Sequence, residues 1–569
     1  MANQRLELTW VGKGEDPAIE PRILLHDPSK DYGDPNTENM LIHGDNLLAL
    51  KALEQEYAGQ VKCVYIDPPF NTGQAFKDYD DNLEHSTWLN LMNARLKVLY
   101  NLLDINGMLW VHLDDIEVHY CKVLLDEIFS RHNFVAHITY ERSAVAGLGQ
   151  GGYLVNTTEH ILLYKKGLLP NKTNYSYEEL GFNIMKRYNR YVSEFGERKL
   201  LKEFVAKSNG EKVKIYEHSD FLIETISLRD SKNREAEIRT AFAEHLDSLF
   251  RGNRVQKENE FQNDIISELE KDKLYSVDYI PSRGKNEGVP TTLYYYNCEL
   301  LSWLKDTTSL SDGNMTKATK MTTLWKHGEI PKADIANEGG VNFPRSKKPE
   351  QLLRRIIEMS TDPGDIVLDS FLGSGTTAAV AHKMGRRYIG IELGDHCYTH
   401  CKPRLDAVID GEQSGISKAV NWHGGGGYKF YELAPTLIVK DKYGNPVFSE
   451  QYSPEMLVAA VAKINGYHYA PDSETFWKQG FCQDNSFIYI TTQYLTGEVL
   501  DGIAAEVGAF ENLLICAPAF DTGLNKRYEN ITVRKIPQSV LDKCQYGVDN
   551  YNLNIIDPPA LDEEEWEDD

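Results

Sequence analysis

The sequence predicts an α/β protein built on a mostly parallel, doubly wound sheet, and three observations lead to that fold class. Short apolar stretches that fit strands alternate with amphipathic helices between residues 40 and 166. The same alternation returns between residues 349 and 410, after a long polar interruption. In this second part, one strand ends in an acidic residue and runs into a Gly-rich turn and a helix, an order that is typical of doubly wound sheets.

The first half of the predicted sheet begins at residues 40–53, where MLIHGDNLLALKAL fits a short strand, a tight turn and a helix with leucines on one face. The apolar strand 61–66 follows, and it must end at two prolines because proline cannot continue a central strand. We then expect a helix around 88–103, the strand MLWVHLD and a helix at 116–129. HILLYKK at 160–166 is a further short strand.

The second half of the sheet is separated from the first by residues 170–325, where the alternation is lost. This stretch is polar, rich in Tyr, Asn, Lys and Glu, with helical pieces such as REAEIRTAFAEHLDSLF, and it predicts an inserted domain. At 349–410 we expect a helix in PEQLLRRIIEMS, a strand in DIVLDSF, a turn, a helix in TAAVAHKMG and a strand in RYIGIEL. Four glycines at 424–427 indicate a boundary or tight turn. Beyond them, SFIYITTQYLTGEVLDGIAAEVGAFENLLICAP predicts a small additional α/β domain.

Length and composition favour a protein of several domains in the cytoplasm. The chain has 569 residues, of which 41% are hydrophobic and 26% charged. It shows neither an uninterrupted apolar run long enough to span a membrane nor a basic flank and apolar run at its start, so we expect no membrane span and no secretory signal. The eight cysteines are scattered without the spacing of a disulfide framework, which favours reduced, buried thiols.

The net charge of −24 is unevenly distributed along the chain. The tail LDEEEWEDD carries seven acidic residues in nine, and such tails are usually solvated. The middle of the chain is about neutral and has local basic clusters such as Lys186, Arg187 and Arg190. A phosphate-facing cleft is therefore compatible with the middle region, although total charge is no argument for one.

One chemical motif is LDSFLGSGTT at residues 368–377. Gly373 and Gly375 let the backbone turn tightly and approach a ligand, and the next helix begins at about Thr376. The strand YIGIEL ends about 17 residues later in Glu392, where a carboxylate is placed to accept hydrogen bonds from ribose hydroxyls. The turn lacks the Gly-Lys-Ser/Thr of a phosphate loop and the third glycine of the dinucleotide fingerprint. It indicates a nucleotide-like cofactor, although a Gly-rich turn alone is often only a turn.

The other motif is Asp67-Pro68-Pro69-Phe70. The exocyclic amine of adenine is a poor nucleophile because its lone pair is delocalised into the ring. Two acceptors, the Asp67 carboxylate and the Pro68 carbonyl, would free that lone pair, and the prolines would hold both acceptors in place. Phe70 offers a flat face for a base taken out of the duplex. Alone the tetrapeptide is weak, because IDPP recurs at 556–559, where it lacks the aromatic residue and is interpreted as linker.

Together the two motifs resemble those of the amino-methyltransferases of DNA. Their catalytic motif is Asp/Asn/Ser-Pro-Pro-aromatic and their cofactor motif is Phe-x-Gly-x-Gly, which stands here as Phe371-Leu372-Gly373-Ser374-Gly375. The catalytic motif comes about 300 residues ahead of the cofactor motif, with an insert between them. This is the order of the beta group, in which a leading Asp is typical of adenine enzymes.

The resemblance extends to the Mod (modification) subunit of type III restriction–modification systems. LTWVGK near the amino terminus, LIHGDNLLALKAL and YIDPPFNTG are similar to stretches of that subunit. The similarity covers about residues 5–165 and 340–430. The chain departs from the pattern at Phe70, where Mod subunits usually have Tyr, which preserves stacking but removes a hydroxyl contact.

This resemblance implies a Rossmann-like methyltransferase that moves a methyl group from S-adenosylmethionine to adenine N6 of duplex DNA after base flipping. The catalytic residues implied are Asp67, Pro68, Pro69 and Phe70. The implied partners are duplex DNA, a second copy in a homodimer and a helicase–nuclease restriction subunit, and no metal is expected. Cofactor contacts are implied for Asp45, Asp67, Lys348, Asp369, Phe371, Gly373, Ser374, Gly375, Thr376 and Glu392.

The predicted domain organisation follows from these assignments. We expect an N-terminal extension, two halves of one methyltransferase domain, a target-recognition insert, an accessory domain and an acidic tail. Their limits are 1–35 for the extension, 36–168 for the catalytic half, 169–325 for the insert, 326–428 for the cofactor-binding half, 429–555 for the accessory α/β domain and 556–569 for the tail.

Other interpretations of the sequence stay open. His396, Cys397, His400 and Cys401 have the spacing of ligands on one helical face, but no second ligand pair accompanies them, which favours packing against the sheet. An NAD-type oxidoreductase is disfavoured by the incomplete glycine fingerprint. A methyltransferase acting on protein or RNA, a DNA methyltransferase without a restriction partner and a non-catalytic specificity scaffold remain as alternatives.

Overall fold

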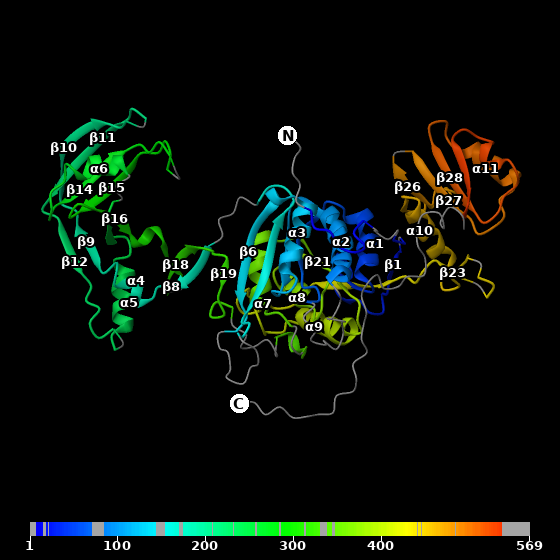
Figure 1. The fold of residues 1–569 in the computed structure, drawn as a ribbon, viewed down its shortest axis with the longest axis horizontal. Coiled ribbons are helices and arrows are strands. Elements are labelled where there is room, and N and C mark those ends of the chain that lie inside the picture. Colours follow the sequence, from blue (N-terminus) through cyan, green and yellow to red (C-terminus); the bar gives the residue numbers. More distant parts are fainter. Residues whose placement is uncertain are drawn as a thin grey trace, which may run out of the picture. The chain divides into compact units, whose positions relative to one another are not determined.

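The structure of the chain is a computed structural model, shown in Figure 1. The chain divides into two compact units, Met1–Lys172 with Thr323–Asp569, and Thr173–Thr322. The second IDPP copy and the acidic tail lie outside the described residues. The residues that the structure describes are 7–14, 19–20, 22–70, 85–143, 154–169, 175–207, 209–231, 233–255, 259–283, 286–311, 314–330, 338–343, 347–440, 442–444, 446–483 and 485–536.

The first unit contains an 11-stranded sheet within the described part of the chain. Its strand order is β1-β22-β3-β21-β20-β4-β5-β7-β6-β19, with β2 paired to β22. The strands from β22 to β5 run parallel, whereas β7 is antiparallel to both of its neighbours. The strands are β1 Leu24–His26, β2 Tyr32–Gly33, β3 Met40–His43, β4 Val61–Ile66, β5 Leu103–Leu113, β6 Phe134–Glu141, β7 Thr158–Lys165, β19 Leu324–Trp325, β20 Ile366–Asp369, β21 Arg387–Glu392 and β22 Gly427–Leu433.

Helices cover both faces of this sheet (Figure 1). On one face, Val64 and Ile66 of β4 pack in a core with residues of α1 (Asn46–Tyr57), α2 (His85–Leu102) and α3 (Val118–Phe129). On the other face, the indole N–H of Trp110 donates to Ser360 Oγ of α7 over 2.8 Å. The helices on that face are α7 Glu350–Ser360, α8 Thr376–Lys383 and α9 Lys402–Ile409. Layers on both faces of a mostly parallel sheet confirm the doubly wound α/β fold that the sequence predicts.

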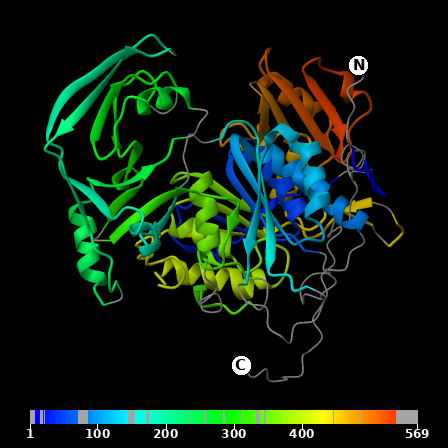
Figure 2. The ribbon, with the colours of Figure 1, turned by 60° about the vertical axis from the view of Figure 1, so that its left-hand side comes forward.

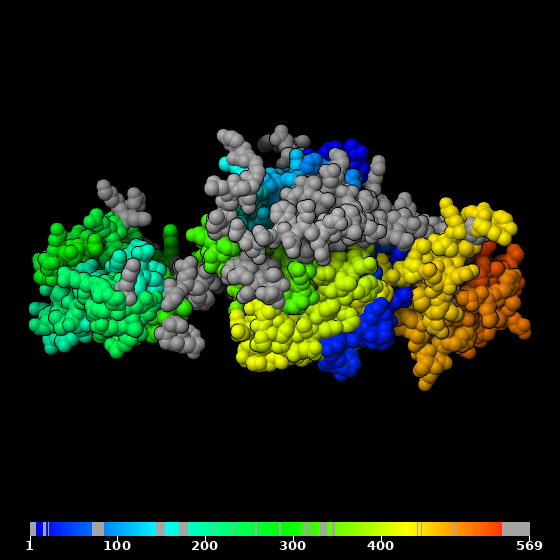
Figure 3. Space-filling model, turned by 90° about the horizontal axis from the view of Figure 1, so that it is seen from below, coloured from blue at the N-terminus to red at the C-terminus, as the bar shows by residue number. Residues whose placement is uncertain are grey.

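The sheet extends further along the sequence than the expected domain limits. β22 lies beyond residue 428, yet it pairs in parallel with β3, and Tyr428 and Phe430 are fully buried. β1 and β2 come from the segment expected to be an extension, and both pair with β22. On the face shown in Figure 3, the blue N-terminal segment lies against yellow residues of this region. Strands of only two to seven residues, such as β1, β2 and β22, carry too little periodicity for a sequence pattern to place them.

The second unit, Thr173–Thr322, is mainly antiparallel sheet. The sequence predicts only helical pieces in this polar stretch. Among its described residues, one sheet has eight strands, ordered β10-β11-β14-β15-β16-β13-β9-β12, and another has the order β17-β18-β8. The long hairpin β10–β11 forms an edge in Figure 2. The predicted helix is real but short, because α5 ends at Glu244 and Leu249 already opens a strand. The elements are β8 Tyr175–Glu179, α4 Phe182–Met185, β9 Arg190–Glu194, β10 Glu197–Val205, β11 Lys212–Ser219, β12 Leu222–Thr225, α5 Glu235–Glu244, β13 Leu249–Asn253, α6 Glu260–Ile266, β14 Leu274–Tyr279, β15 Thr291–Tyr296, β16 Glu299–Trp303, β17 Thr308–Ser311 and β18 Asn314–Lys320.

The carboxyl-terminal part of the first unit contains a small sheet with the order β25-β26-β27-β28-β29. β27, α11 and β28 stand where the sequence predicts strand, helix and strand, and the two strands pair in parallel. None of the helices in the described ranges is long and apolar enough to cross a bilayer. The elements of this part are β23 Ile438–Lys440, β24 Pro446–Phe448, α10 Pro454–Ile464, β25 His468–Tyr469, β26 Gly480–Gln483, β27 Ser486–Ile490, α11 Gly497–Glu506, β28 Asn512–Ala517 and β29 Ile531–Lys535.

Candidate active site

Both predicted motifs lie at the point where the strand order of the large sheet reverses. β20 and β4 are parallel neighbours, with Leu368 paired to Val64. From β20 the sheet continues through β21 to β3, and from β4 it continues through β5, so the chain winds away in opposite directions. Ligands of doubly wound sheets bind in the crevice outside the carboxyl ends of strands at such a point. Asp369 ends β20 and Asp67 follows β4, so the fold brings together two residues far apart in the sequence.

The Asp67–Phe70 loop is fixed by the helix that follows it. The indole N–H of Trp88, a fully buried residue of α2, donates to the Pro69 carbonyl over 2.8 Å. Oδ2 of Asp67 lies 2.8 Å from Nζ of Lys348. Oδ1 of the same carboxylate is buried and has no hydrogen-bond partner among the described residues. Because a buried carboxylate oxygen without a donor is costly, Oδ1 is poised to accept a hydrogen bond from a ligand.

Lys348 lies between Asp67 and a second carboxylate, Glu159 of β7. Its Nζ is 4.0 Å from Oε2 of Glu159. Burial acts to raise the pKa of Glu159, but Lys348 and His112 outweigh it and hold that pKa well below its usual range. Burial also acts to lower the pKa of Lys348, but the two carboxylates raise it above its ordinary value. The site therefore holds a lysine ammonium close to the carboxyl groups of both Asp67 and Glu159.

His112, near the end of β5, connects this group to the aromatic residue of the loop. Its Nε2 lies 2.8 Å from Oε2 of Glu159, and its Nδ1 is 2.9 Å from the Tyr65 hydroxyl. Which of the two groups donates in the Tyr65 contact depends on the tautomer of His112. The ring centroids of His112 and Phe70 are 6.1 Å apart, and Lys348 Nζ lies 4.8 Å from the Phe70 centroid.

The carboxylate of Asp369 shapes the Gly-rich turn from inside. Oδ1 accepts from the backbone N–H of Phe371 over 2.9 Å, and Oδ2 accepts from the Thr377 hydroxyl over 2.6 Å. Burial, together with the charges of Asp67 and Glu392, raises the pKa of Asp369 to about 7 against the effect of these hydrogen bonds. Asp369 thus positions the turn through both of its oxygens.

The two glycines of the turn have different roles. Both have positive φ, +56° at Gly373 and +81° at Gly375. A Cβ added at Gly375 would meet Cα of Cys401 at 3.3 Å, so this position allows close helix packing. A Cβ added at Gly373 would meet, within 4 Å among described residues, only the Phe371 carbonyl of its own turn at 4.0 Å. As far as the described residues go, Gly373 therefore faces open space, as a backbone that approaches a ligand requires.

Glu392 and Asp45 hold backbone at the edges of the same crevice. Oε2 of Glu392 accepts from the N–H of Gly373 over 2.6 Å. Asp45 caps α1 by accepting from Leu48 over 3.0 Å, and it pairs with the buried Arg95 at 3.3 Å. Burial raises the pKa of Asp45, and Arg95 opposes that rise. The carboxylates of Glu392 and Asp45 thus already accept hydrogen bonds from backbone N–H groups of this chain.

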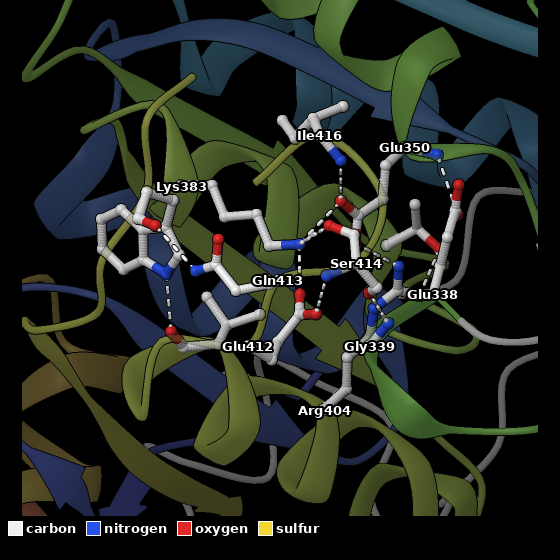
Figure 4. A network of polar contacts seen from close by, with 12 residues as sticks. Glu338, Gly339, Glu350, Lys383, Arg404, Glu412, Gln413, Ser414 and Ile416 are labelled. Carbon is white, nitrogen blue, oxygen red and sulfur yellow. Dashed lines mark hydrogen bonds and ion pairs between the residues drawn. The ribbon is translucent and has the colours of Figure 1, made fainter. Parts of the chain in front are cut away.

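A buried ionic network supports the turn from the side of α9 (Figure 4). Nη1 of Arg404 donates to the Thr376 hydroxyl over 2.7 Å, and Nη2 donates to Glu350 Oε1 over 2.9 Å. Oε2 of Glu350 accepts from Lys383 over 2.8 Å and from the N–H of Ile416 over 3.1 Å. Arg404, Glu350 and Lys383 have no exposed side-chain surface, so breaking one pair would leave a buried charge uncompensated.

The predicted site residues separate into two groups in this structure. Asp67, Phe70 and Lys348 contact one another directly or through one residue. The residues predicted between 371 and 376 line or brace the Gly-rich turn: Phe371 is 7% exposed within the main core, and the Ser374 and Thr376 hydroxyls lie 3.2 Å apart beside Arg404. The π-helical turn Cys397–Cys401 buries both cysteines, and His396 pairs with Glu392 at 2.9 Å.

Sequence reasoning missed four charged or polar residues at the site: Arg95, His112, Glu159 and Arg404. Two of them leave a visible signal, because His112 interrupts the apolar strand MLWVHL and Glu159 is the second residue of β7, just before its apolar stretch. A polar residue within a central strand must find a partner when it is buried. Arg95 and Arg404 lie in helices, where an arginine is ordinarily solvated, so their burial is not visible in the sequence.

A doubly wound sheet with the Asp67–Phe70 loop and the Gly-rich turn at its switch point is the arrangement that we compared with known protein families. Residues 61–402 match the family model described as DNA methylase, covering N6 and N4 enzymes, and the chain belongs to this family.

Three similar proteins illustrate the relationship. The probable type III restriction–modification enzyme HindVI Mod subunit of Haemophilus influenzae is 39% identical over 417 residues, which are 70% of this chain and 54% of that protein. The type III enzyme StyLTI Mod subunit of Salmonella typhimurium is 26% identical over 415 residues, 65% of this chain and 55% of that protein. The chain thus spans about half the length of these curated relatives. A solved structure, the PvuII DNA methyltransferase (cytosine-N4-specific), is 14% identical, covers 68% of this chain and 91% of its own, and has a TM-score of 0.32.

Proposed function

We propose that the chain transfers a methyl group from S-adenosylmethionine to the N6 amine of adenine in duplex DNA. The observation that carries this proposal is the buried Oδ1 of Asp67, unpartnered among the described residues. It lies at the switch point of the sheet, beside the open turn at Gly373. Membership of the DNA methylase family supports the reaction, and a leading Asp in the catalytic loop supports adenine as the base.

The donor set around the turn fits S-adenosylmethionine. Asp67 and Glu392 lie close enough to Asp369 for their charges to raise its pKa, so acidic groups gather at the crevice. The cofactor carries a sulfonium and an ammonium, and positive charge is favourable next to such a group. Gly373 leaves space for the cofactor, and Glu392 ends the strand on which a ribose acceptor is expected. When bound, the cofactor supplies an electrophilic methyl group.

Asp67 and the Pro68 carbonyl are the proposed acceptors for the two amine hydrogens. With both hydrogens held in fixed hydrogen bonds, the nitrogen lone pair is released from the ring and directed at the methyl carbon. As the new N–C bond forms, the electrons of the C–S bond stay on sulfur. The methylated amine then returns to neutrality by giving one proton to the Asp67 carboxylate, which releases it to solvent.

Phe70 is the proposed stacking platform for the flipped adenine. Phe70 is only partly buried, and it follows Asp67 by three residues in the same loop. Stacking of a base on an aromatic side chain is worth about 1–3 kcal/mol and tolerates any aromatic residue. A base held against Phe70 would present its amine to the neighbouring carboxylate.

Recognition and assembly are proposed from the insert and from the relatives. We propose that Thr173–Thr322 selects the methylated sequence, since the catalytic sheet is complete without it. Because the curated relatives are named as Mod subunits of type III restriction–modification enzymes, we propose that the chain works as a modification and specificity subunit. A homodimer and a helicase–nuclease restriction subunit are the corresponding partners, and pull-down with the purified chain tests the latter.

The experiment for the proposed function is incubation of the chain with duplex DNA and S-adenosylmethionine, followed by digestion and mass spectrometry of the nucleosides. We expect N6-methyldeoxyadenosine. Methyl groups found on cytosine N4 instead would overturn the choice of base, and the absence of methyl groups from DNA would overturn the activity.

A further inference from the structure

We propose that Lys348 is a positioning residue whose ammonium holds Oδ2 of the catalytic Asp67 carboxylate, here called the outer oxygen. Glu159 and His112 in turn hold the lysine in place, and we call this arrangement the clamp. The clamp rests on the proposed function, because its effect is to leave Oδ1 of Asp67 free for the target amine. It gives Lys348 a role different from the cofactor contact that the resemblance implies.

The two oxygens of Asp67 differ in what they contact. Oδ2 is ion-paired with Lys348 at 2.8 Å, whereas Oδ1 is buried and is bonded by none of the described residues. A guanidinium presents a planar fork that matches both oxygens of a carboxylate, whereas an ammonium is a compact point charge, and the ammonium of Lys348 is paired with Oδ2. The lysine therefore fixes the orientation of the carboxylate and assigns one oxygen to the protein and the other to the ligand.

Glu159 explains why the ammonium stays on the outer oxygen. Its Oε2 lies 4.0 Å from Lys348 Nζ and 2.8 Å from His112 Nε2. Arg142 lies 3.4 Å from the other oxygen, Oε1. Since Lys348 and His112 keep the pKa of this buried carboxyl low, Glu159 is a fixed negative charge close to the Lys348 ammonium. Without that charge, the ammonium would be free to move over Asp67 and block Oδ1.

The backbone that carries Lys348 is anchored on both sides. Before it, the Lys347 ammonium donates to the carbonyls of Glu338 and Val341, the latter over 2.8 Å. After it, the Glu350 side chain is held by Arg404 and Lys383, as Figure 4 shows. The N–H of Glu350 also donates to Glu338 Oε2 over 3.1 Å. Lys348 is thus presented by a fixed segment, which a clamp requires.

The test is a double-mutant cycle on the full chain with Glu159→Gln and Lys348→Met, singly and together. Glu127→Gln is the matched control. Glu127, on α3, is also a largely buried carboxylate, and it is paired with Lys13 at 2.8 Å. For each single variant at the clamp we expect kcat to fall roughly tenfold or more, while calorimetric affinity for S-adenosylmethionine stays within about twofold. The double variant should match the worse single variant, because coupled residues are not additive.

Lys348→Arg supplies a second measurement that preserves charge. A guanidinium engages a carboxylate through two oxygens, so we expect it to occupy Oδ1 and lower kcat despite the retained charge. Fluorescence of 2-aminopurine at the target position should still report base flipping in every variant. A role that needs only the positive charge predicts instead that Lys348→Arg stays active, so the Arg variant separates the two accounts.

The outcomes separate the clamp from the function on which it rests. No methyl transfer by the unaltered chain would overturn both. Transfer by the unaltered chain with full activity in Glu159→Gln, or single effects that multiply in the double variant, would overturn the clamp alone. A Lys348→Met variant that binds S-adenosylmethionine more weakly while kcat is preserved would likewise overturn it, in favour of a cofactor contact.

Discussion

Nζ of Lys348 lies 2.8 Å from Oδ2 of Asp67, while Oδ1 of the same carboxylate is buried without a donor among the described residues. The two residues come from the two separate halves of the sheet domain, on either side of the insert. Through this contact, a residue of the cofactor-binding half orients the Asp67 carboxylate, which is the side-chain acceptor of the Asp67–Phe70 loop. An amine that reaches this site meets one oxygen already committed and one still available.

Phe70 should tolerate other aromatic residues. Phe70→Tyr and Phe70→Trp keep a flat face, so we expect both variants to retain substantial methyl transfer, whereas Phe70→Ala should lose it, since stacking is worth about 1–3 kcal/mol. Initial rates on one duplex substrate at saturating cofactor measure the effect. Equal activities in all three variants would exclude stacking as the role of this ring.

Glu392 should affect the cofactor and not the DNA. Glu392→Gln keeps one carbonyl oxygen for the backbone N–H groups but removes the charge that we place next to the cofactor. We expect weaker binding of S-adenosylmethionine in calorimetry and an unchanged DNA sequence preference in filter binding. Unaltered cofactor affinity would exclude a direct contact and leave Glu392 only as a brace for Gly373.

Asp369 should make the cofactor-free protein less stable as the pH rises. Its pKa in the folded chain is raised to about 7 from 3.8, so its favourable contribution is fully present below the lower value and is lost as pH rises through the higher one. At about 1.4 kcal/mol per pKa unit, the loss approaches about 4 kcal/mol. Thermal melting from about pH 5 to about pH 8 should show a fall in the wild type that Asp369→Asn reduces. Parallel pH profiles for the two proteins would contradict this account.

The insert should determine which sequence is methylated. Exchanging Thr173–Thr322 for the equivalent segment of a relative with another site should transfer the donor's specificity, with cofactor affinity unchanged. Sequencing that detects methylated adenines in DNA from expressing cells measures the outcome. An active chimera that still modifies the original site would place recognition elsewhere, most simply in the carboxyl-terminal domain.

The sequence predicts the parts of the site that depend on local pattern. Two prolines stop a strand after Ile66, and an acid ends the strand before the Gly-rich turn, so the meeting of Asp67 and Asp369 follows from the rule for parallel sheets. His112 and Glu159 could not be paired in this way, because β5 and β7 are antiparallel and their register depends on the whole sheet.

The insert was harder to predict for a related reason. In β11, Val213 and Ile215 are buried and alternate with Lys212 and Lys214, which is the pattern of a half-buried strand. The stretch nevertheless has a polar composition overall, and its antiparallel partners are spread over more than one hundred residues. Such nonlocal pairing is decided by tertiary packing, which propensity and composition do not contain.

The central claim is that Asp67 is the acceptor that activates the target amine, and Asp67→Ala tests it most directly. Transfer of tritium from labelled S-adenosylmethionine to duplex DNA should fall by roughly 100-fold or more, as is usual when a preorganised contact to the reacting group is lost. Circular dichroism and melting should show a folded protein, because Lys348 keeps Glu159 as a counter-charge. A folded Asp67→Ala protein that retained more than about a tenth of wild-type transfer would contradict the account.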